Sequence, residues 1–211
     1  AGCSSHDVVN RVRRILATKK VGHTGTLDPF ATRVLPIAVG EGTKAIPFLD
    51  EGEKRYQATL QLGLITDTQD NTGAVLQQTD YSQVDEAALR QAMASLTGEI
   101  DQVPPMFSAI KQGGQPLYKL ARKGIEVERT ARRVLIKRFE LLAFEPPLAQ
   151  AEVHCSRGTY VRTLADDLGR MLNCGACLTE LRRTMSGPFR LEQALSLEEL
   201  EAVVAGDAID Q

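Results

Sequence analysis

The chain has 211 residues, of which 43% are hydrophobic and 25% charged, and its formal net charge at pH 7 is −2. This composition is typical of a globular protein and excludes the disordered and fibrous classes. The length suits one large domain, or one domain with a small appendage. No apolar run reaches the roughly 18 residues that a membrane helix needs, so we expect no membrane partner. The first residues lack the features of a signal peptide, and the four cysteines are not spaced as in a disulfide-bonded framework. We therefore expect a cytoplasmic protein.

The charge is distributed unevenly along the chain. Residues 111–138 carry nine Lys and Arg against two acids, and residues 1–44 carry seven against three. The compensating acids lie mainly in residues 64–103 and 191–211. A polyanion responds to the local field rather than to the total charge. The net charge of −2 therefore excludes no nucleic-acid partner.

Hydrophobic periodicity predicts the elements of the N-terminal half. Residues 4–20 begin with serine caps and continue at helical spacing, which predicts a helix. Its apolar face consists of Val8, Val9, Val12, Ile15 and Leu16. Residues 55–63 alternate apolar and polar side chains as a half-buried strand does, and residues 66–75 form a polar turn into another strand. Asp67 and Asp70 in this turn lack the further oxygens of a Ca²⁺ loop, so we interpret them as turn formers.

The C-terminal half mixes helices and strands. A Ser-x-x-Asp signature and a following glycine predict a helix over 82–98, and residues 102–124 form a basic segment with Pro, Gly and one short helix. Strands are predicted at 133–144 and 149–156, the latter with an apolar face of Ala149, Ala151, Val153 and Cys155. Helices are predicted at 158–172, 177–184 and 196–204. Strands in sequence with helices between groups favour an α+β fold.

Most common cofactor motifs are missing from the sequence. It has no P-loop, no dinucleotide fingerprint and no zinc-binding histidine pair. Cys174 and Cys177 form an isolated Cys-x-x-Cys. A zinc site would have to recruit Cys155 or His154, and a thioredoxin-like site needs a different βαβ context. Packing explains the two thiols more simply, so we predict structural cysteines and no metal site. A zinc or redox protein is a rival that metal analysis tests.

The stretch VGHTGTLDPFATRVLP, residues 21–36, holds the main candidate for chemistry. Asp28 precedes a proline and is therefore restricted to an extended or turn conformation. Gly22 and Gly25 allow close approach to a ligand or positive φ values. Together they can present a carboxylate from a stiff loop. The same letters also suit an ordinary turn into a buried strand.

Three further side chains could belong to the same site. Arg162 is the best candidate to keep a carboxylate ionised and oriented, since a guanidinium binds it bidentately and lowers its pKa. Asp166 follows four residues later, so the alternative is a helical surface pair. Tyr56 and Tyr160 could each stack on a base or lie half-buried in the core.

Four blocks of the sequence, taken in order, resemble the motifs of the TruB family of tRNA pseudouridine synthases, also called tRNA pseudouridine-55 synthases. They are GHTGTLDPFATRVLPIAVGEGTKA, KRYQATLQLGLITDTQDNTG, PPMFSAIKQGGQPLYKLARKG and CSRGTYVRTLADDLG followed by CGACLTELRR. The resemblance covers nearly the whole chain. It implies an α+β fold on a mixed, mainly antiparallel sheet with flanking helices and a central RNA-binding cleft. It also implies cofactor-free isomerisation of a T-loop uridine in tRNA, with base flipping.

The resemblance assigns roles by position. Asp28 matches the catalytic aspartate, and Arg162 matches the residue that pairs with its carboxylate. The resemblance therefore favours Asp28 over Asp166 as the partner of Arg162. The substrate-binding positions are the base-stacking Tyr56, the pocket residues Tyr160 and Leu181, and His23, which holds the flipped T-loop. We predict RNA contacts from Lys19, Lys20 and Lys111, the last in a basic RNA-clamping insertion at 104–138. For Lys19 and Lys20, at the end of the N-terminal helix, a solvated helix surface is the alternative interpretation.

The chain also departs from the family pattern. Arg33 stands where the family normally has a glycine. An arginine side chain adds bulk and positive charge at a position where the backbone could need the conformational freedom of glycine. The family's first apolar strand and its PUA-type C-terminal domain are missing, so we interpret residues 1–211 as a catalytic domain, and as a fragment. The alternative function is a non-catalytic T-arm RNA-binding or tRNA-folding module. For either function we expect a monomer whose partner is the T-arm of tRNA.

Overall fold

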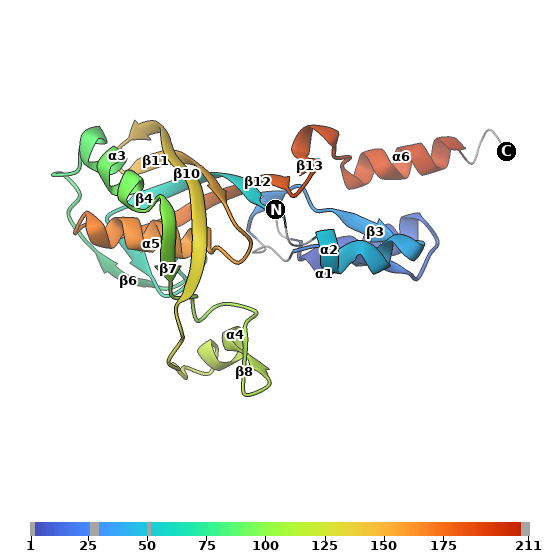
Figure 1. Cartoon of the computed structure of the whole chain (residues 1–211), viewed down its shortest axis with the longest axis horizontal. Helices are drawn as coiled ribbons and strands as arrows, with labels where there is room; N and C mark the ends of the chain where they lie inside the picture. Colours follow the sequence, from blue (N-terminus) through green and yellow to red (C-terminus); the bar gives the residue numbers. More distant parts are fainter. Residues whose placement is uncertain (1–2, 26–29, 50–51, 208–211) are drawn as a thin grey trace. The chain divides into compact units, whose positions relative to one another are not determined.

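The computed structural model describes residues 3–25, 30–49 and 52–207 (Figure 1). The chain divides into two compact units, residues 1–56 with 182–211 and residues 57–181. Strands β4 (Lys54–Leu62) and β12 (Ala176–Ser186) have residues in both units. Within the described ranges no helix is long and apolar enough to cross a membrane; α1, α5 and α6 each have 11 residues, where about 20 are needed.

The first unit packs α1 (Ser5–Ile15) and α6 (Leu197–Asp207) with an antiparallel pair of short strands, β1 (Val21–His23) and β3 (Ile37–Val39). α1 begins with a capping box, in which Ser4 and Asp7 satisfy each other's backbone N–H groups. The core consists of Val9, Val12 and Val21, surrounded by Val8, Leu16, Ile37, Leu197 and Leu200. The apolar face predicted for the N-terminal helix is therefore confirmed for Val8, Val9, Val12 and Leu16, whereas Ile15 is not part of this core. The other elements are β2 (Thr32–Arg33), the 3-10 helices η1 (Gly40–Ala45) and η2 (Leu191–Gln193), α2 (Ile46–Leu49) and β13 (Phe189–Arg190).

The segment that follows residues 26–29 is held by β12. Thr32 and Arg33 pair in parallel with Arg182 and Arg183. The Arg183 side chain is buried and donates from Nε and Nη2 to the carbonyl of Val34, at 3.1 and 3.0 Å. Arg33 lies in ordinary strand conformation, because the described non-glycine residues with positive φ are Ala17, Gln69 and Asn173. The backbone at position 33 therefore does not require a glycine.

The second unit is a sheet with the strand order β12-β4-β11-β10-β7 (Figure 1). Its long strand β10 (Arg132–Glu145) pairs antiparallel with both β7 (Gly98–Gln102) and β11 (Leu148–Cys155). The apolar face predicted for 149–156 is confirmed, since Ala149, Ala151, Val153 and Cys155 are fully buried. The other elements are the hairpin of β5 (Leu64–Thr66) and β6 (Val75–Gln78), α3 (Glu86–Ser95), β8 (Lys111–Gln112), β9 (Gln115–Pro116), α4 (Leu117–Ala121) and α5 (Val161–Met171). The α+β, mainly antiparallel fold is confirmed.

One predicted helix is wrong. Residues 177–184 lie within strand β12, where the buried Leu181 and Arg183 alternate with the more exposed Glu180, Arg182 and Thr184. In isolation Leu, Glu and Arg favour helices, but this preference is worth only about a few tenths of a kcal/mol per residue. Pairing and packing within a sheet override a preference of this size. A smaller difference concerns α3, whose N-cap is Asp85 rather than Ser82.

Helix α5 lies so close to the turn before β12 that position 169 has no room for a side chain. A Cβ on Gly169 would lie 2.1 Å from the backbone nitrogen of Ala176 and 2.3 Å from the carbonyl carbon of Gly175. Gly169→Ala is therefore expected to lower the free energy of unfolding by about 1–3 kcal/mol, the usual cost of overpacking. Urea unfolding followed by circular dichroism measures this change.

Gly206→Ala provides the matched control, because this glycine also lies in a helix, α6, and a Cβ there meets nothing within 4 Å. It should leave stability unchanged or raise it by up to about 1 kcal/mol. Equal unfolding free energies for the two variants would contradict the close approach of α5 to the turn.

Candidate active site

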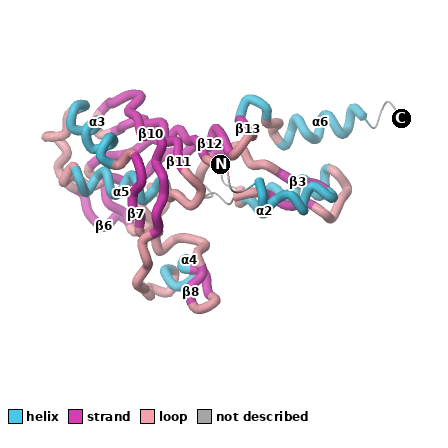
Figure 2. Tube along the Cα trace, viewed as in Figure 1, coloured by secondary structure: helices cyan, strands magenta, loops and turns pink. Residues whose placement is uncertain are grey.

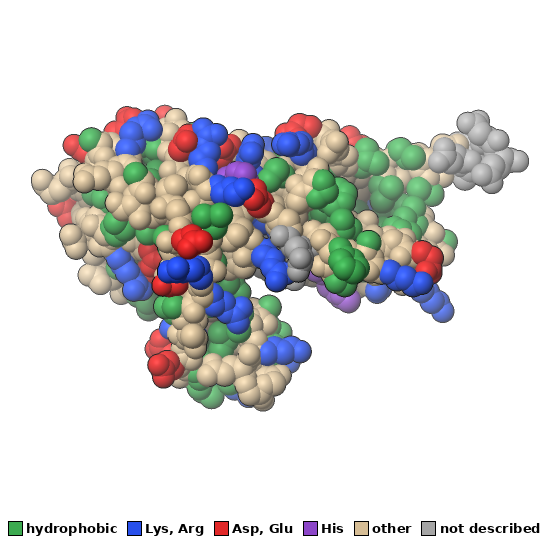
Figure 3. Space-filling view, viewed as in Figure 1, with side chains coloured by type: hydrophobic (Ala, Val, Ile, Leu, Met, Phe, Trp, Pro, Cys, Tyr) green, Lys and Arg blue, Asp and Glu red, His purple; other side chains and the backbone are tan. Residues whose placement is uncertain are grey.

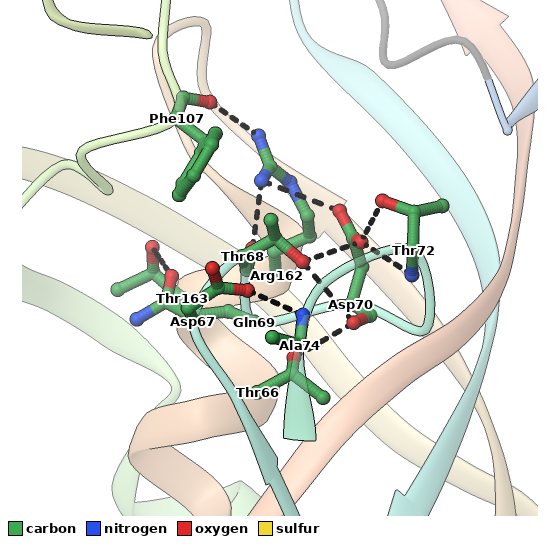
Figure 4. Close-up of polar contacts among 10 residues, drawn as sticks. All are labelled: Thr66, Asp67, Thr68, Gln69, Asp70, Thr72, Ala74, Phe107, Arg162 and Thr163. Atoms are coloured by element: carbon green, nitrogen blue, oxygen red, sulfur yellow. Dashed lines mark hydrogen bonds and ion pairs between the residues drawn. The ribbon is translucent and has the colours of Figure 1, made fainter. Parts of the chain in front are cut away.

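A buried polar cluster in residues 57–181 centres on Arg162, the second residue of α5 (Figure 4). Its side chain is only 4% exposed, and Nη1 lies 3.3 Å from Oδ2 of Asp70. Nη1 also donates to the carbonyl of Thr68 at 2.8 Å, and Nη2 donates to the carbonyl of Phe107 at 3.0 Å. A guanidinium with a fixed fork of donors is strongly oriented by such a set of acceptors. The direction of the Arg162 side chain is therefore set by three separate backbone and side-chain groups.

Asp70 is held in place by the turn that carries it. One carboxylate oxygen, Oδ1, accepts hydrogen bonds from the Thr68 hydroxyl at 2.7 Å and from the backbone N–H and hydroxyl of Thr72 at 2.9 and 2.5 Å. The other oxygen, Oδ2, faces Arg162. The sequence interpretation of Asp70 as a turn former is thus incomplete, because the same carboxylate is also the ion-pair partner of a buried arginine. Sequence reasoning missed this role.

The turn is docked on α5 by Gln69, which adopts a positive φ of 63°. Its side-chain amide donates to Oδ2 of Asp166 at 2.9 Å. Its side-chain carbonyl accepts from the hydroxyl of Thr163 at 2.9 Å (Figure 4). Asp166 in turn forms an ion pair with Arg170 at 2.8 Å. Asp166 was the alternative partner considered for Arg162. It instead binds Gln69 of the 66–75 turn and forms its ion pair with Arg170, four residues later in α5.

The predicted pocket residues are distributed over both units. Tyr160 is the N-cap residue of α5 and is half-buried, two positions before Arg162, and Leu181 in β12 is buried. Tyr56 in β4 is buried, and His23 ends β1 opposite Ile37 of β3. Asp28, the predicted catalytic residue, lies outside the described residues. The structure thus brings together Tyr160 and Arg162, with Asp70 as an unpredicted member.

The predicted RNA-binding lysines are exposed. Lys19 and Lys20 lie between α1 and β1, and Lys20 forms an ion pair with Glu41. Lys111 starts the β8 strand of the 104–138 segment and pairs with Pro116 of β9, which α4 follows. Figure 2 shows mainly loop around these elements. The end of the segment belongs to β10, which starts at Arg132. Lys and Arg side chains are spread over the surface of this insertion (Figure 3).

The Cys-x-x-Cys pair is buried and reduced. Cys174 and Cys177 are 2% and 0% exposed and form no disulfide. Burial raises the pKa of the Cys174 thiol, and burial with the nearby charge of Asp70 raises the pKa of Cys177 to about 11. At neutral pH both sulfurs are protonated, and the thiolate is the form that binds metals or attacks disulfides. This favours the interpretation of the two thiols as packing residues.

The Asp70–Arg162 pair should contribute strongly to stability. Asp70→Asn replaces the carboxylate facing Arg162 with a neutral amide at a buried position, a change expected to cost about 3–5 kcal/mol. Asp67→Asn is the matched control in the same turn, because its exposed side chain accepts a hydrogen bond from the N–H of Ala74, which an amide oxygen can also accept. Urea unfolding of both variants provides the measurement. A cost for Asp70→Asn no larger than that for Asp67→Asn would contradict the buried ion pair.

Comparison with known proteins identifies the family. The TruB family pseudouridylate synthase (N terminal domain) model matches residues 13–161, and the tRNA pseudouridylate synthase B C-terminal domain model matches residues 162–211. The chain is 57% identical to a tRNA pseudouridine synthase B of Geobacter sulfurreducens over 99% of this chain and 69% of the relative. It is also 57% identical to one of Geotalea uraniireducens, over 94% of this chain and 64% of the relative. The chain thus spans about two thirds of the length of these relatives.

Solved structures give the same result for the fold. The crystal structure of a Cbf5-Nop10-Gar1 complex matches with a TM-score of 0.79 and 31% identity, over 99% of this chain and 53% of that chain. The structure of an H/ACA RNP bound to a substrate RNA containing 2′-deoxyuridine matches with a TM-score of 0.74 and 28% identity, over 99% and 52%. With two family models that together cover residues 13–211, the chain belongs to the TruB family of pseudouridylate synthases.

Proposed function

We propose that this chain isomerises a uridine in the T-loop of tRNA to pseudouridine, with Asp28 as the catalytic carboxylate. The observation that carries the proposal is the buried guanidinium of Arg162, which Asp70, Thr68 and Phe107 hold at the start of α5. The name tRNA pseudouridine synthase B, borne by relatives up to 57% identical, supports the same reaction class.

The reaction requires a carboxylate that is ionised and oriented. The bond between C1′ of the ribose and N1 of uracil breaks, and a new bond forms between C1′ and C5 of the same base. N1 gains a proton and C5 loses one, so the substrate and product have the same composition. In the proposal Asp28 assists the first cleavage, either by attacking the sugar or by initiating glycal formation. A fixed guanidinium nearby would favour the charged form of such a carboxylate and orient it.

The remaining predicted residues fit a base-binding role. A uridine within a folded T-loop has to leave its stack before an enzyme reaches C1′ and C5. In the proposal Tyr56 stacks on the flipped base, Tyr160 and Leu181 line its pocket, and His23 holds the loop in its flipped state. A site that excludes water matters, because water would convert isomerisation into loss of the base.

Substituting Asp28 tests catalysis directly. In the proposal Asp28→Asn keeps the shape of the side chain but removes the charge, so tritium release from a T-arm hairpin labelled at uridine C5 should fall by at least about 10³-fold. Binding of the hairpin, measured by filter retention, should change little. Asp67→Asn is the control and should retain full release.

Two results would contradict the proposed function. One is release by Asp28→Asn at the wild-type rate, which would remove Asp28 from the chemistry. The other is tight binding of the hairpin by the wild-type chain with no release, which would favour the alternative of a non-catalytic RNA-binding or tRNA-folding module.

The lysines of the two basic regions should contribute unequally to RNA binding. Among the described residues no carboxylate pairs with Lys111, whereas Glu41 partly neutralises Lys20. Lys111→Ala should therefore reduce the slope of log affinity against log salt by about 0.7–0.9 for one lost phosphate contact, and Lys20→Ala by less. Hairpin titrations at several salt concentrations measure both slopes. A larger change for Lys20→Ala would reverse the assignment.

A further inference from the structure

We propose that Gln102 is a positioning residue for this site, because its buried amide fixes the backbone of Tyr160 and thereby the side chains of Tyr160 and Arg162. The inference rests on the proposed function and extends it to a residue whose role no sequence pattern suggested. Gln102 would not touch the uridine; it would act through the start of α5.

The geometry is a two-point bond between a side chain and a peptide backbone. Oε1 of Gln102 accepts from the N–H of Tyr160 at 2.8 Å, and Nε2 donates to the carbonyl of the same residue at 3.1 Å. Gln102 is the last residue of β7 and only 2% exposed. An uncharged amide supplies one acceptor and one donor side by side. It therefore matches the N–H and C=O of one extended residue as a neighbouring strand would.

Tyr160 is the residue at which α5 begins. Its backbone is extended, with φ −99° and ψ 107°, and its side chain forms no capping hydrogen bond to the helix. The carbonyl of Tyr160 also accepts the first helical hydrogen bond, from the N–H of Leu164 at 3.1 Å. Helix starts usually need a capping side chain to satisfy and fix them. Here Gln102, from a distant strand, fixes the N-cap residue itself.

A second link joins the same two segments. Arg162, two residues after Tyr160, donates to the carbonyl of Phe107, five residues after Gln102. The end of β7 and the start of α5 are thus bonded twice, once through a side chain from each segment (Figure 4 shows the Arg162 link). The two links join different pairs of residues, Gln102 with Tyr160 and Phe107 with Arg162, so sliding one segment along the other would break them.

A buried glutamine could also serve only to stabilise the fold. The two roles differ in what is lost when the amide is removed. A purely structural loss lowers the fraction of folded protein and leaves the folded molecules fully active. A positioning loss leaves folded molecules that bind RNA but react slowly, since misplacement of a catalytic group by about 1 Å can cost on the order of 100-fold in rate.

The experiment measures the single-turnover rate of tritium release and the hairpin affinity for the wild-type chain, Gln102→Met and Gln102→Glu, well below their melting temperatures. Methionine keeps the length of the side chain and removes both hydrogen bonds. Glutamate keeps the acceptor for the N–H of Tyr160 but sets a second acceptor against its carbonyl. We expect the rate to fall by about 100-fold for both variants, with the affinity within about threefold of wild type.

Leu141→Ala is the matched stability control. Leu141 is 6% exposed and lies in β10, far along that strand from Arg132, which pairs with Gln102. It should lower the melting temperature at least as much as Gln102→Met and leave the single-turnover rate unchanged. In a Tyr160→Ala background, Gln102→Met should cost less than in the wild type, because part of what it positions is already missing.

Each outcome decides the inference. A wild-type rate for Gln102→Met with a lowered melting temperature would overturn it and leave Gln102 a stabilising residue. Equal rate losses for Gln102→Met and Leu141→Ala, or costs that multiply fully with Tyr160→Ala, would also overturn it. No release by the wild-type chain would overturn the proposed function, and this inference with it.

Discussion

The ion pair between Arg162 and Asp70 is the interaction on which this region of the protein depends. A guanidinium in a buried position is costly unless its donors are satisfied and its charge is matched. The Asp70 carboxylate matches the charge, and the carbonyls of Thr68 and Phe107 accept from the two terminal nitrogens, Nη1 and Nη2. These acceptors come from two loops that are distant in sequence from α5. Satisfying one side chain therefore fixes the relative placement of three segments within residues 57–181.

This requirement also explains the unusual conformation of the turn. Gln69 adopts φ 63°, a region that non-glycine residues occupy at some cost. It lies between Thr68 and Asp70, which both bind Arg162, and its own side chain bonds to Thr163 and Asp166 on α5. The cost of the Gln69 conformation is thus offset by the hydrogen bonds of its own side chain to α5 and by the contacts of Thr68 and Asp70 with Arg162. A turn that looked from its composition like a simple polar connection is a support for the arginine.

The sequence predicted what depends on local periodicity and missed what depends on distant pairing. The apolar faces of α1 and β11 followed from spacing alone, because burial repeats with the period of each element. The helix expected at 177–184 failed because its residues favour helices while sheet pairing decides. The blocks that resemble the family pointed to Tyr160 and Arg162, but no local signal linked either to Gln102 or Asp70. Those partners become visible only when the fold brings β7, the turn and α5 together.

Arg33 stands where a glycine was expected from the resemblance to the family, and the structure limits the ways in which Arg33 can affect the site. A glycine is required where φ is positive or where another group leaves no room for a Cβ. Arg33 lies in β2, pairs in parallel with Arg183 and adopts no positive φ. Its Nη2 donates to the carbonyl of Cys3 at 3.0 Å, so the added charge has a backbone acceptor. Backbone strain is therefore not the means by which position 33 can affect the site. Any effect of Arg33 on the reaction has to come from its positive charge or its bulk, five residues after Asp28 in the chain.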